Sequence, residues 1–403
     1  MRPRLLFLTN QLPFPPVSGG VIKSWRLLQH LSAHFDVTLF TLLKNGDADH
    51  EAELRSGIAL KGYLGVAIER PRSALNFLKS LVLSPTLNCY RNDSALLRDA
   101  VTKALPQHDL VLIDHLEMAQ YIPPPDGGPL KVVLHQHNAE FIMWQRSLSI
   151  ARNMAEKLVL KVEAARVKRF EIAACKAADL VFAAPNDQDE LVPLGVPKEK
   201  FRTTYHLGDD SGLTAPVLDY ARTEPALLYV GTLSWPANAD GLKWFLYDVF
   251  PVLKKKHPHL RLDIVGKGAD EELQAAVTAS PGATLLGFVE DLEPLYQRSR
   301  VFIAPLRFGS GTKVKVVTAL YRGLPCATTS IGTEGLDLSD GNEVMLADDA
   351  AGTIARIDTL LTDRATWERM RDQSRKKAAL DLSWNNMLDT HVQDLNALLA
   401  QRP

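Results

Sequence analysis

Val301-Phe-Ile-Ala-Pro305, followed by Gly309-Ser-Gly-Thr-Lys-Val-Lys-Val-Val-Thr-Ala-Leu-Tyr-Arg-Gly-Leu-Pro325, is the stretch that decides the fold. The pattern predicts a strand, a glycine-rich loop, a helix and a helix stop, in that order. Gly309 and Gly311 let the backbone turn tightly and approach a ligand closely. The helix that follows directs its free N–H groups and the positive end of its dipole at the loop. Together these parts predict a place to hold a diphosphate.

The same strand-and-helix alternation extends in both directions from this stretch. It is typical of parallel sheets built from β-α-β units, so the fold class is α/β, with two doubly wound Rossmann-like domains facing a cleft. A loop-like stretch from His206 to Pro225 is the best domain boundary. A long helix is expected over about 152–177. Strands are expected near residues 4–9, 36–42, 64–69, 109–114, 131–137 and 179–183, then 226–231, 261–266, 283–287, 300–304, 325–329 and 343–347.

The net charge, the cysteine content and the length of the apolar runs bear on the possible partners and location of the protein. The chain has 403 residues and a formal net charge of −1, which argues against nucleic acid as a partner. The three cysteines have neither metal-ligand spacing nor a disulfide pattern, which favours a reducing cytoplasm. The apolar run at the N-terminus is too short for a signal peptide and is expected to be a buried strand. No stretch approaches the ~18 apolar residues of a membrane span, so any contact with the inner face of a membrane would be peripheral.

Several stretches, taken together, resemble the family 4 retaining glycosyltransferases. The 309–325 segment is similar to the branch whose donor loop reads roughly Gly-Gly-Gly-Thr-Arg-Leu-Lys-Ile-Leu-Glu-Ala. Other stretches follow that branch in the same order: Tyr229-Val-Gly-Thr-Leu-Ser-Trp-Pro-Ala-Asn-Ala-Asp240, Asp263-Ile-Val-Gly266, Gly287-Phe-Val-Glu-Asp291, Thr329-Ser-Ile-Gly-Thr-Glu-Gly335 and Leu382-Ser-Trp384. The resemblance covers the C-terminal half nearly end to end.

The resemblance implies a GT-B fold and metal-independent, retaining transfer of a sugar from a nucleotide diphosphate donor, with no cofactor. The acceptor would be a glycan or a lipid-linked molecule in cell-surface polysaccharide synthesis. It implies an N-terminal acceptor-side domain over 1–210, a donor-binding domain over 211–383, and a helix over 384–403 that returns to the N-terminal domain. The donor-binding residues would be Gly19, Gly20, Arg307, Gly309, Ser310, Gly311, Thr312, Lys313, Lys315, Thr318 and Glu334.

Two lysines and two differences from the family sequence bear on the assignment of the donor-binding residues. Lys313 and Lys315 lie on roughly opposite sides of the helix, so they cannot both face the donor in the same way. Lys313 matches the basic residue of the family loop, whereas Lys315 is either a second phosphate contact or a solvated charge. The family has glutamates at the positions of Ser310 and Thr318. The Thr318 hydroxyl either contacts the ribose weakly or bonds back to its own helix.

Other acids and bases near the donor loop allow two interpretations each. Glu334 could supply a missing carboxylate or be solvated, and Arg307 could reach a phosphate or lie on the surface. Asn238 and Asp240 follow a predicted strand, where they are expected to cap the next helix, Asp240 above all.

Histidines follow two strands of the first half. His135 and His137 alternate at the end of one strand, so both side chains face the same way, but a metal pair lacks an obvious third ligand. The resemblance implies a histidine near the transferred sugar, His137 or His115. Catalysis is therefore assigned to His137, His115 and Lys313. Glu140 is expected to begin a helix and is also a candidate contact for the acceptor.

One helix-like stretch, 70–83, combines basic residues with an apolar stripe. It is either a membrane-surface helix that recognises a lipid-linked acceptor, or a helix that packs Leu75, Leu78 and Leu81 into the core. The core interpretation is preferred.

Two alternative functions remain open for the whole chain. Loss of both family glutamates favours a degenerate enzyme that serves as a binding or scaffold subunit. A sugar-nucleotide epimerase of the same architecture is the third possibility.

Overall fold

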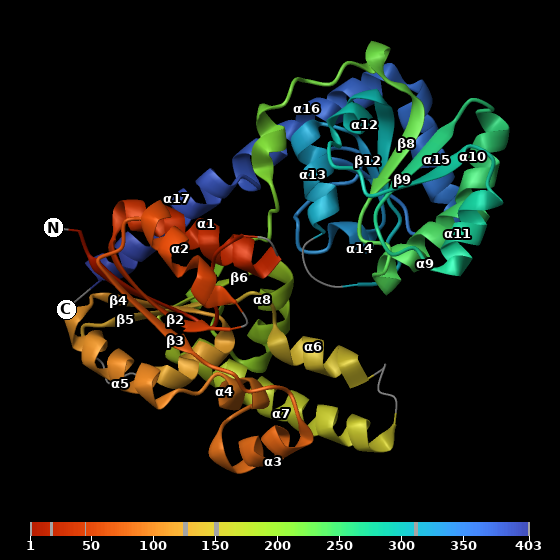
Figure 1. Ribbon diagram of the computed structural model, residues 1–403. Helices are drawn as coiled ribbons and strands as arrows, with labels where there is room; N and C mark the ends of the chain where they lie inside the picture. Colours follow the sequence, from red (N-terminus) through yellow and green to blue (C-terminus); the bar gives the residue numbers. More distant parts are fainter. Residues whose placement is uncertain are drawn as a thin grey trace. The chain divides into compact units, whose positions relative to one another are not determined.

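The computed structural model describes residues 2–16, 19–44, 46–123, 128–148, 153–309 and 313–401. The chain forms two compact units, Met1–His206 with Met387–Pro403, and Leu207–Asn386. The sequence had placed the boundaries at 210/211 and 383/384. Each unit is an α/β fold with one sheet covered by helices (Figure 1).

The first unit contains a seven-stranded sheet whose described ladders are all parallel, in the order β3-β2-β1-β4-β5-β6-β7. This is a doubly wound order with its switch point between β1 and β4. The short last strand was not predicted. The strands are β1 (Arg4–Thr9), β2 (Asp36–Leu43), β3 (Gly62–Ala67), β4 (Leu110–Asp114), β5 (Lys131–His135), β6 (Leu180–Ala183) and β7 (Phe201–Thr203).

Helices cover this sheet because its strands are apolar on both faces. Leu6, Leu8 and Val111 are completely buried, as expected for strands between two helix layers. The helices are α1 (Gly19–His34), α2 (Glu51–Gly57), α3 (Ala74–Leu83), α4 (Leu87–Arg91), α5 (Ala95–Ala104), α6 (Glu140–Ser147), α7 (Met154–Ala177) and α8 (Pro185–Leu191).

The second unit repeats the design with six strands, in the order β10-β9-β8-β11-β12-β13, again with parallel ladders. Its switch point lies between β8 and β11. The strands are β8 (Glu224–Val230), β9 (Arg261–Val265), β10 (Ala283–Gly287), β11 (Ser299–Ala304), β12 (Cys326–Thr328) and β13 (Val344–Leu346). The helices are α9 (Pro236–Trp244), α10 (Phe250–Lys256), α11 (Glu271–Thr278), α12 (Glu293–Arg298), α13 (Val314–Arg322), α14 (Ser330–Thr333), α15 (Ala350–Thr362) and α16 (Arg364–Asp381).

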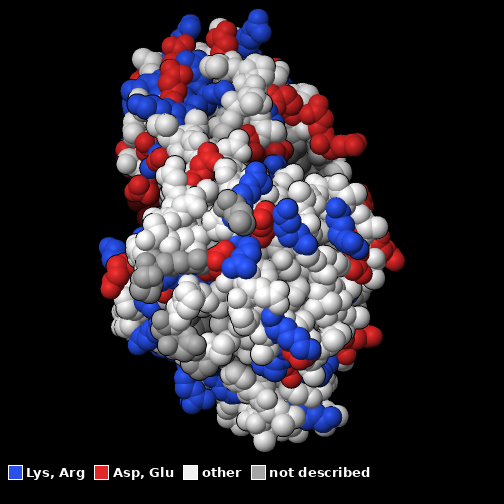
Figure 2. Space-filling model, turned by 90° about the vertical axis from the view of Figure 1, so that its left-hand side faces the viewer, with Lys and Arg blue, Asp and Glu red and all other residues white. Residues whose placement is uncertain are grey.

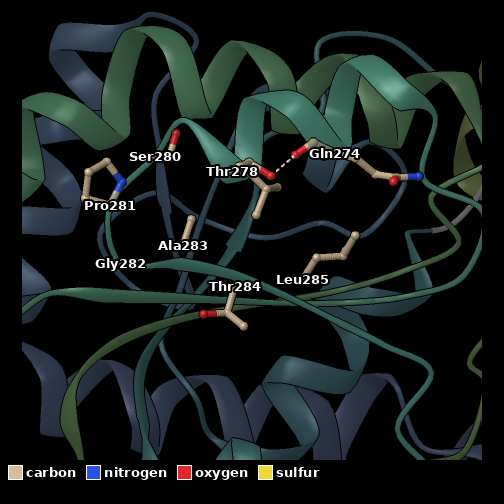
Figure 3. A pocket seen from close by; sticks show the side chains of 9 residues that line it. Gln274, Thr278, Ser280, Pro281, Gly282, Ala283, Thr284 and Leu285 are labelled. Atoms are coloured by element: carbon tan, nitrogen blue, oxygen red, sulfur yellow. Dashed lines mark hydrogen bonds between the residues drawn. The ribbon is translucent and has the colours of Figure 1, made fainter.

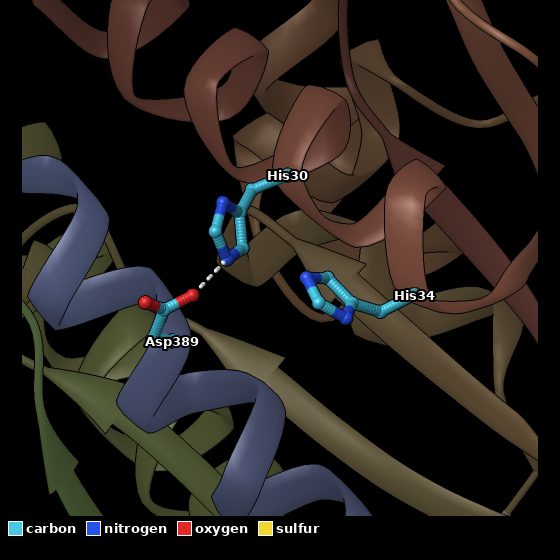
Figure 4. Close-up of side chains that lie close together, drawn as sticks. All are labelled: His30, His34 and Asp389. Carbon is cyan, nitrogen blue, oxygen red and sulfur yellow. Dashed lines mark ion pairs between the residues drawn. The ribbon is translucent and has the colours of Figure 1, made fainter.

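The last helix, α17 (Trp384–Ala400), begins in the second unit and packs mostly on the first. The His391 ring stacks on Phe182 of β6 with 4.0 Å between ring centroids. Asp389 accepts an ion-pair contact of 2.9 Å from His30 of α1, beside His34 (Figure 4). The aromatic stack on β6 and the contact of Asp389 with α1 therefore tie α17 to the first unit.

Two local predictions are wrong. Asn238 and Asp240 lie inside α9, which begins at Pro236 after Trp235, so neither is its cap. Leu75, Leu78 and Leu81 of α3 are 60, 60 and 43% exposed, so they do not pack into the core. The face of α3 that does pack inward carries Phe77 and Ser80 instead.

The surface drawn in Figure 2 mixes basic, acidic and uncharged side chains, in keeping with the near-neutral formal charge. Among the helices that the structure describes, none combines the length and apolar character needed to cross a bilayer.

Candidate functional site

A buried carboxylate, Asp114, lies at the switch point of the first sheet. The parallel register places it beside Thr9 of β1 and His135 of β5, all at the carboxyl ends of their strands. The Thr9 hydroxyl donates to Asp114 Oδ2 at 2.9 Å, and the hydroxyl of Ser24 on α1 donates to the same oxygen at 2.7 Å. Because carboxyl ends at a switch point are the usual ligand site of such sheets, Asp114 marks a candidate site.

Three histidines also contact Asp114. His135 Nδ1 and His137 Nε2 each lie 2.8 Å from Oδ1, and His115 Nδ1 lies 3.2 Å from Oδ2. The rings of His115 and His137 stack with centroids 3.8 Å apart. His115 has a left-handed φ of 79°, a conformation rare outside glycine, which turns its ring onto His137. The structure thus brings together both histidines that the sequence singled out.

The three histidine rings differ in how much of their surface is exposed to solvent. His135 is buried, whereas His115 and His137 retain 14 and 11% of their side-chain surface. A Cβ built on Gly20 would lie 3.6 Å from His137 Nδ1, so this glycine is next to the ring. Gly19, beside it, begins α1. The predicted glycine loop and the predicted histidine therefore lie together in the first unit.

The pKa values of Asp114, His115 and His137 are shifted from their ordinary values in different directions. Burial alone would raise the pKa of Asp114, but the charges of His115 and His137 and hydrogen bonds from His115 and His135 hold it well below its usual range. Burial would lower the pKa of His115, yet Asp114 outweighs it and the pKa is raised. The pKa of His137 falls well below its ordinary value because of burial and the charge of His115. The carboxylate therefore favours the protonated form of His115, whereas burial favours the neutral form of His137, whose ring is stacked on it.

A buried lysine adds a second cation. The Lys23 ammonium group on α1 donates to the Gln136 carbonyl oxygen at 3.1 Å. Burial lowers the pKa of Lys23 to about 8, opposed by the charges of Asp187 and Asp114. Burial and Lys23 together lower the pKa of His135 to about 4, so this ring is neutral.

Glu140 begins α6, as predicted, in an acidic neighbourhood. Burial and the charges of Glu117 and Glu171 raise its pKa to about 8, although the Asn88 amide donates to it at 3.3 Å. Glu171 accepts hydrogen bonds from the backbone N–H groups of Glu140 and Phe141 at 2.9 and 3.0 Å, which satisfies the start of the helix. Near neutral pH Glu140 therefore carries a proton that it can donate.

The second candidate region is the switch point of the other sheet, where β11 leads to α13. Lys313 immediately precedes α13, is buried, and its Nζ lies 3.5 Å from Glu334 Oε2. Glu334, proposed as a donor contact, therefore partners the lysine here. Gly309 has a left-handed φ of 137°, which fits the glycine-rich loop. Ser310, Gly311 and Thr312, three predicted donor contacts, lie outside the described residues.

Lys315 is not a solvated charge, contrary to one of its two predicted roles. Its Nζ donates to the Tyr229 hydroxyl at 2.7 Å and to Asn238 Oδ1 at 2.5 Å. Burial and the charge of Lys313 lower its pKa to about 7. A Cβ on Gly231, just after β8, would come within 2.9 Å of this nitrogen, so the absence of a side chain there makes room for the ammonium group.

Arg307 and Thr318 both have partners within the protein. Arg307 makes two hydrogen bonds to Asp240, from Nε at 2.8 Å and Nη2 at 2.6 Å. The Thr318 hydroxyl donates to the Val314 carbonyl oxygen one turn earlier, at 2.9 Å, which is the helix back-bond among its two interpretations.

Two groups of described side chains have the composition and spacing to hold a metal ion. One is Asp114 with His115 and His137. The other is His30, His34 and Asp389, where α1 and α17 meet (Figure 4). In the first group the carboxylate already engages hydroxyl and imidazole donors.

A separate hollow of about 470 Å³ lies elsewhere in the second unit. It is lined by the end of α11 and the start of β10, from Gln274 to Leu285 (Figure 3). It therefore opens at the amino end of β10, opposite the carboxyl end where Gly287 lies.

Sequence reasoning missed Asp114, Lys23 and Ser24. Asp114 ends a predicted strand next to the singled-out His115, and an acid at that position is a signal that could have been used. Nothing in the local pattern of α1 shows that Lys23 and Ser24 turn inward, because that depends on how the helix packs on the sheet.

Comparison with known proteins extends these observations. Residues 224–363 match the sequence profile of the family described as glycosyl transferases group 1. An uncharacterized 44.6 kDa protein in the cps region of Klebsiella pneumoniae is 33% identical over 130 residues, which are 30% of this chain and 34% of that protein. Glycogen synthase 2 of Bradyrhizobium diazoefficiens is 26% identical over 201 residues, 46% of this chain and 40% of the enzyme. The match thus spans well under half the length of these relatives.

Solved structures match over nearly the whole chain at low identity. The Anabaena protein HepE in complex with UDP is 14% identical with a TM-score of 0.64, covering 98% of this chain and 100% of that one. Sucrose-phosphate synthase from Thermosynechococcus elongatus is 16% identical with a TM-score of 0.61, covering 99% and 100%. The lipopolysaccharide outer core galactosyltransferase WaaB is 13% identical with a TM-score of 0.61, covering 96% and 99%. The chain therefore has the predicted GT-B fold, and its second unit contains a segment that matches glycosyl transferases group 1.

Proposed function

We propose that this protein transfers a sugar from a nucleoside diphosphate donor to a glycan or lipid-linked acceptor in cell-surface polysaccharide synthesis. The observation that carries the proposal is the pair of buried or half-buried lysines, Lys313 and Lys315, at the switch point of the second sheet. They lie in the segment that matches glycosyl transferases group 1. HepE, a structural neighbour, has been solved with UDP and with UDP-glucose, which supports a uridine nucleotide as the first donor to test.

The lysines would stabilise the leaving diphosphate. Lys313 precedes α13, so its charge and the helix dipole act in the same place. Lys315 donates hydrogen bonds to the neutral oxygens of Tyr229 and Asn238. A bound phosphate would add a negatively charged acceptor to these two. Charge from two lysines and a helix supports a mechanism without a metal. Activity that persists in a strong chelator is the expected result.

The first unit would supply the groups that meet the sugar and the acceptor. His137, neutral and partly exposed, would bond a sugar hydroxyl while Asp114 fixes its ring. His115 would hold positive charge beside it. Glu140, protonated near neutral pH, is a candidate acceptor contact. Retention of configuration at the sugar is expected from the family resemblance and is tested by the anomeric form of the product.

The nucleoside end would meet Phe288, which follows β10 directly. Its ring is 66% exposed, and Lys267 Nζ lies 4.1 Å from the ring centroid. An exposed aromatic ring with an adjacent cation, at the carboxyl edge of the sheet, suits stacking against a base. Phe288→Ala should weaken nucleotide binding without changing turnover.

Thermal unfolding with a panel of nucleoside diphosphates tests the donor site. A ligand that binds only the folded state raises the melting temperature by mass action. UDP or GDP should raise it for the wild type and for Lys376→Ala, an exposed lysine on α16 that serves as the matched control. Lys313→Ala should lose most of the shift. A full shift in Lys313→Ala would place the diphosphate elsewhere.

A catalytically silent binding subunit is the second candidate. It is favoured by Thr318, which replaces the family glutamate and bonds its own helix, and by the neutral Ser310. Assays of donor breakdown, with membrane extract as acceptor, separate the two candidates. Nucleotide binding without release of diphosphate from any donor would establish the silent subunit.

A further inference from the structure

The outward face of α3 is apolar, which reverses the usual pattern of a surface helix. Leu75, Leu78 and Val82 are 60, 60 and 86% exposed and lie at i, i+3 and i+7, along one stripe of the helix. Leu83 extends this stripe. Single exposed leucines are common, but an exposed apolar stripe along a helix is a signature of an interaction surface.

The first half of α7 also exposes apolar side chains. Met154, Leu158, Val159 and Val162 are exposed there. Arg166 of α7 anchors the two helices to each other, because its guanidinium donates to the carbonyl oxygens of Ser80 and Ser84 at 2.6 and 2.8 Å, near the C-terminal end of α3. Figure 1 shows α3 and α7 next to each other.

The charge of this surface is positive. Residues 70–84 and 153–162 together contain five basic residues and one acidic residue, Glu156. The basic residues are Arg70, Arg72, Lys79, Lys157 and Lys161. Arg72 also lies over the Trp144 ring of α6, at 5.7 Å from its centroid. Apolar side chains among lysines and arginines suit the boundary between acyl chains and anionic headgroups.

We infer that α3 and the first half of α7 form a docking surface for an anionic lipid bilayer. The leucines and valines enter the headgroup boundary, and the exposed Lys79, Lys157 and Lys161 meet lipid phosphates. Charge complementarity selects this occupant over a second copy of the chain, whose matching surface would carry the same positive charge. The inference deepens the proposed use of a lipid-linked acceptor and rests on its own chemistry, because it needs no nucleotide.

Flotation of the full-length protein with vesicles is the test. The wild type should float with vesicles of phosphatidylcholine mixed with phosphatidylglycerol, and much less with phosphatidylcholine alone. Leu78→Asn/Val82→Asn should weaken partitioning at least about tenfold, since each side chain loses its apolar burial in the bilayer. Lys79→Gln/Lys157→Gln/Lys161→Gln should abolish the preference for the anionic vesicles. Leu96→Asn, which changes a 61% exposed leucine on α5, should bind like the wild type.

Three results would overturn the inference. They are absence of binding to anionic vesicles, unchanged binding by Leu78→Asn/Val82→Asn, and a wild-type dimer in solution that the same variant dissociates, which would make the surface a self-association face. The melting-temperature shift with UDP or GDP is measured on each variant. Since the altered residues lie outside the nucleotide region, failure of docking and failure of the donor site give different results.

Discussion

The switch points of the two sheets use charge in opposite ways. In the first unit one buried carboxylate, Asp114, is surrounded by hydroxyl and imidazole donors. In the second unit Lys315 lies against neutral oxygens, and Lys313 lies 3.5 Å from the half-exposed Glu334. The first arrangement uses one carboxylate to hold imidazole rings and hydroxyl groups in place, whereas the second sets two lysines beside a single carboxylate. The same fold thus surrounds one buried carboxylate with donors in the first unit and brings two lysines together in the second, where we propose that the donor diphosphate binds.

The largest expected effect tests how rigid the first cluster is. Asp114→Asn should lower the free energy of unfolding by about 3 kcal/mol, because it leaves buried imidazole and hydroxyl donors without their anion. Asp240→Asn, at the half-exposed ion pair with Arg307, is the control and should cost about 1 kcal/mol or less. Urea denaturation at constant pH measures both. If both variants lose the same free energy of unfolding, the Asp114 cluster is no more tightly held than the ion pair of Asp240 with Arg307.

Glu140 gives the next effect, which depends on pH. A carboxyl whose pKa is raised to about 8 in the folded state is protonated there while the unfolded chain is ionised. Stability from that proton is present below the unfolded pKa near 4.5 and is lost as pH rises towards 8. Glu140→Gln should therefore match the wild type near pH 5 and gain on the order of 2 kcal/mol relative to it at pH 8.

Urea denaturation of both proteins across this range measures that difference. Comparing the variant with the wild type removes the opposing effect of the buried histidines, which is common to both. A constant difference between pH 5 and 8 would show that Glu140 is ionised throughout, and would remove it as a proton donor to an acceptor.

Lys315 yields a smaller, functional effect in the second region. Because its pKa is about 7, the ammonium form is half populated near neutral pH, and a bound diphosphate favours that form. Nucleotide affinity should fall several-fold between pH 6 and pH 8.5. Lys315→Met should bind more weakly and lose most of this pH dependence. Isothermal titration with UDP or GDP at several pH values measures this affinity. If the pH dependence is unchanged in Lys315→Met, a group other than Lys315 causes it.

The doubly wound fold class and most strand positions could be predicted because buried parallel strands are short apolar runs in the sequence. The edge strand β7 was missed, since Phe201–Thr203 is too short and polar to stand out. The prediction that the α3 leucines pack into the core was wrong for a different reason. Helical periodicity shows that Leu75 and Leu78 share a face, but only packing shows which way that face points.

The site was predictable to the extent that residues near each other in sequence also meet in space. His115 and His137 follow adjacent strands, so their meeting could be inferred. The ion pair of Arg307 with Asp240 and the contact of Lys315 with Asn238 join segments far apart in the chain. Asn238 and Asp240 look like helix caps by position, yet α9 begins earlier, at Pro236. Both side chains are therefore free to bond Lys315 and Arg307.

Thr318 gives the smallest expected change and the sharpest distinction between enzyme and silent subunit. Its hydroxyl bonds the Val314 carbonyl oxygen, so Thr318→Ala exchanges that bond for better helix propensity and should alter stability by less than about 0.5 kcal/mol. Thr318→Glu restores the family acid at a half-buried position. If the side chain reaches a ribose, nucleotide affinity should rise while the fold stays intact, because a carboxylate makes charge-assisted bonds to hydroxyl groups. Titration and urea denaturation on the same variant give the answer. A stable variant with unchanged affinity would show that Thr318 does not face the nucleotide, and the excess charge of Lys313 and Lys315 would then have to hold the donor without a ribose clamp.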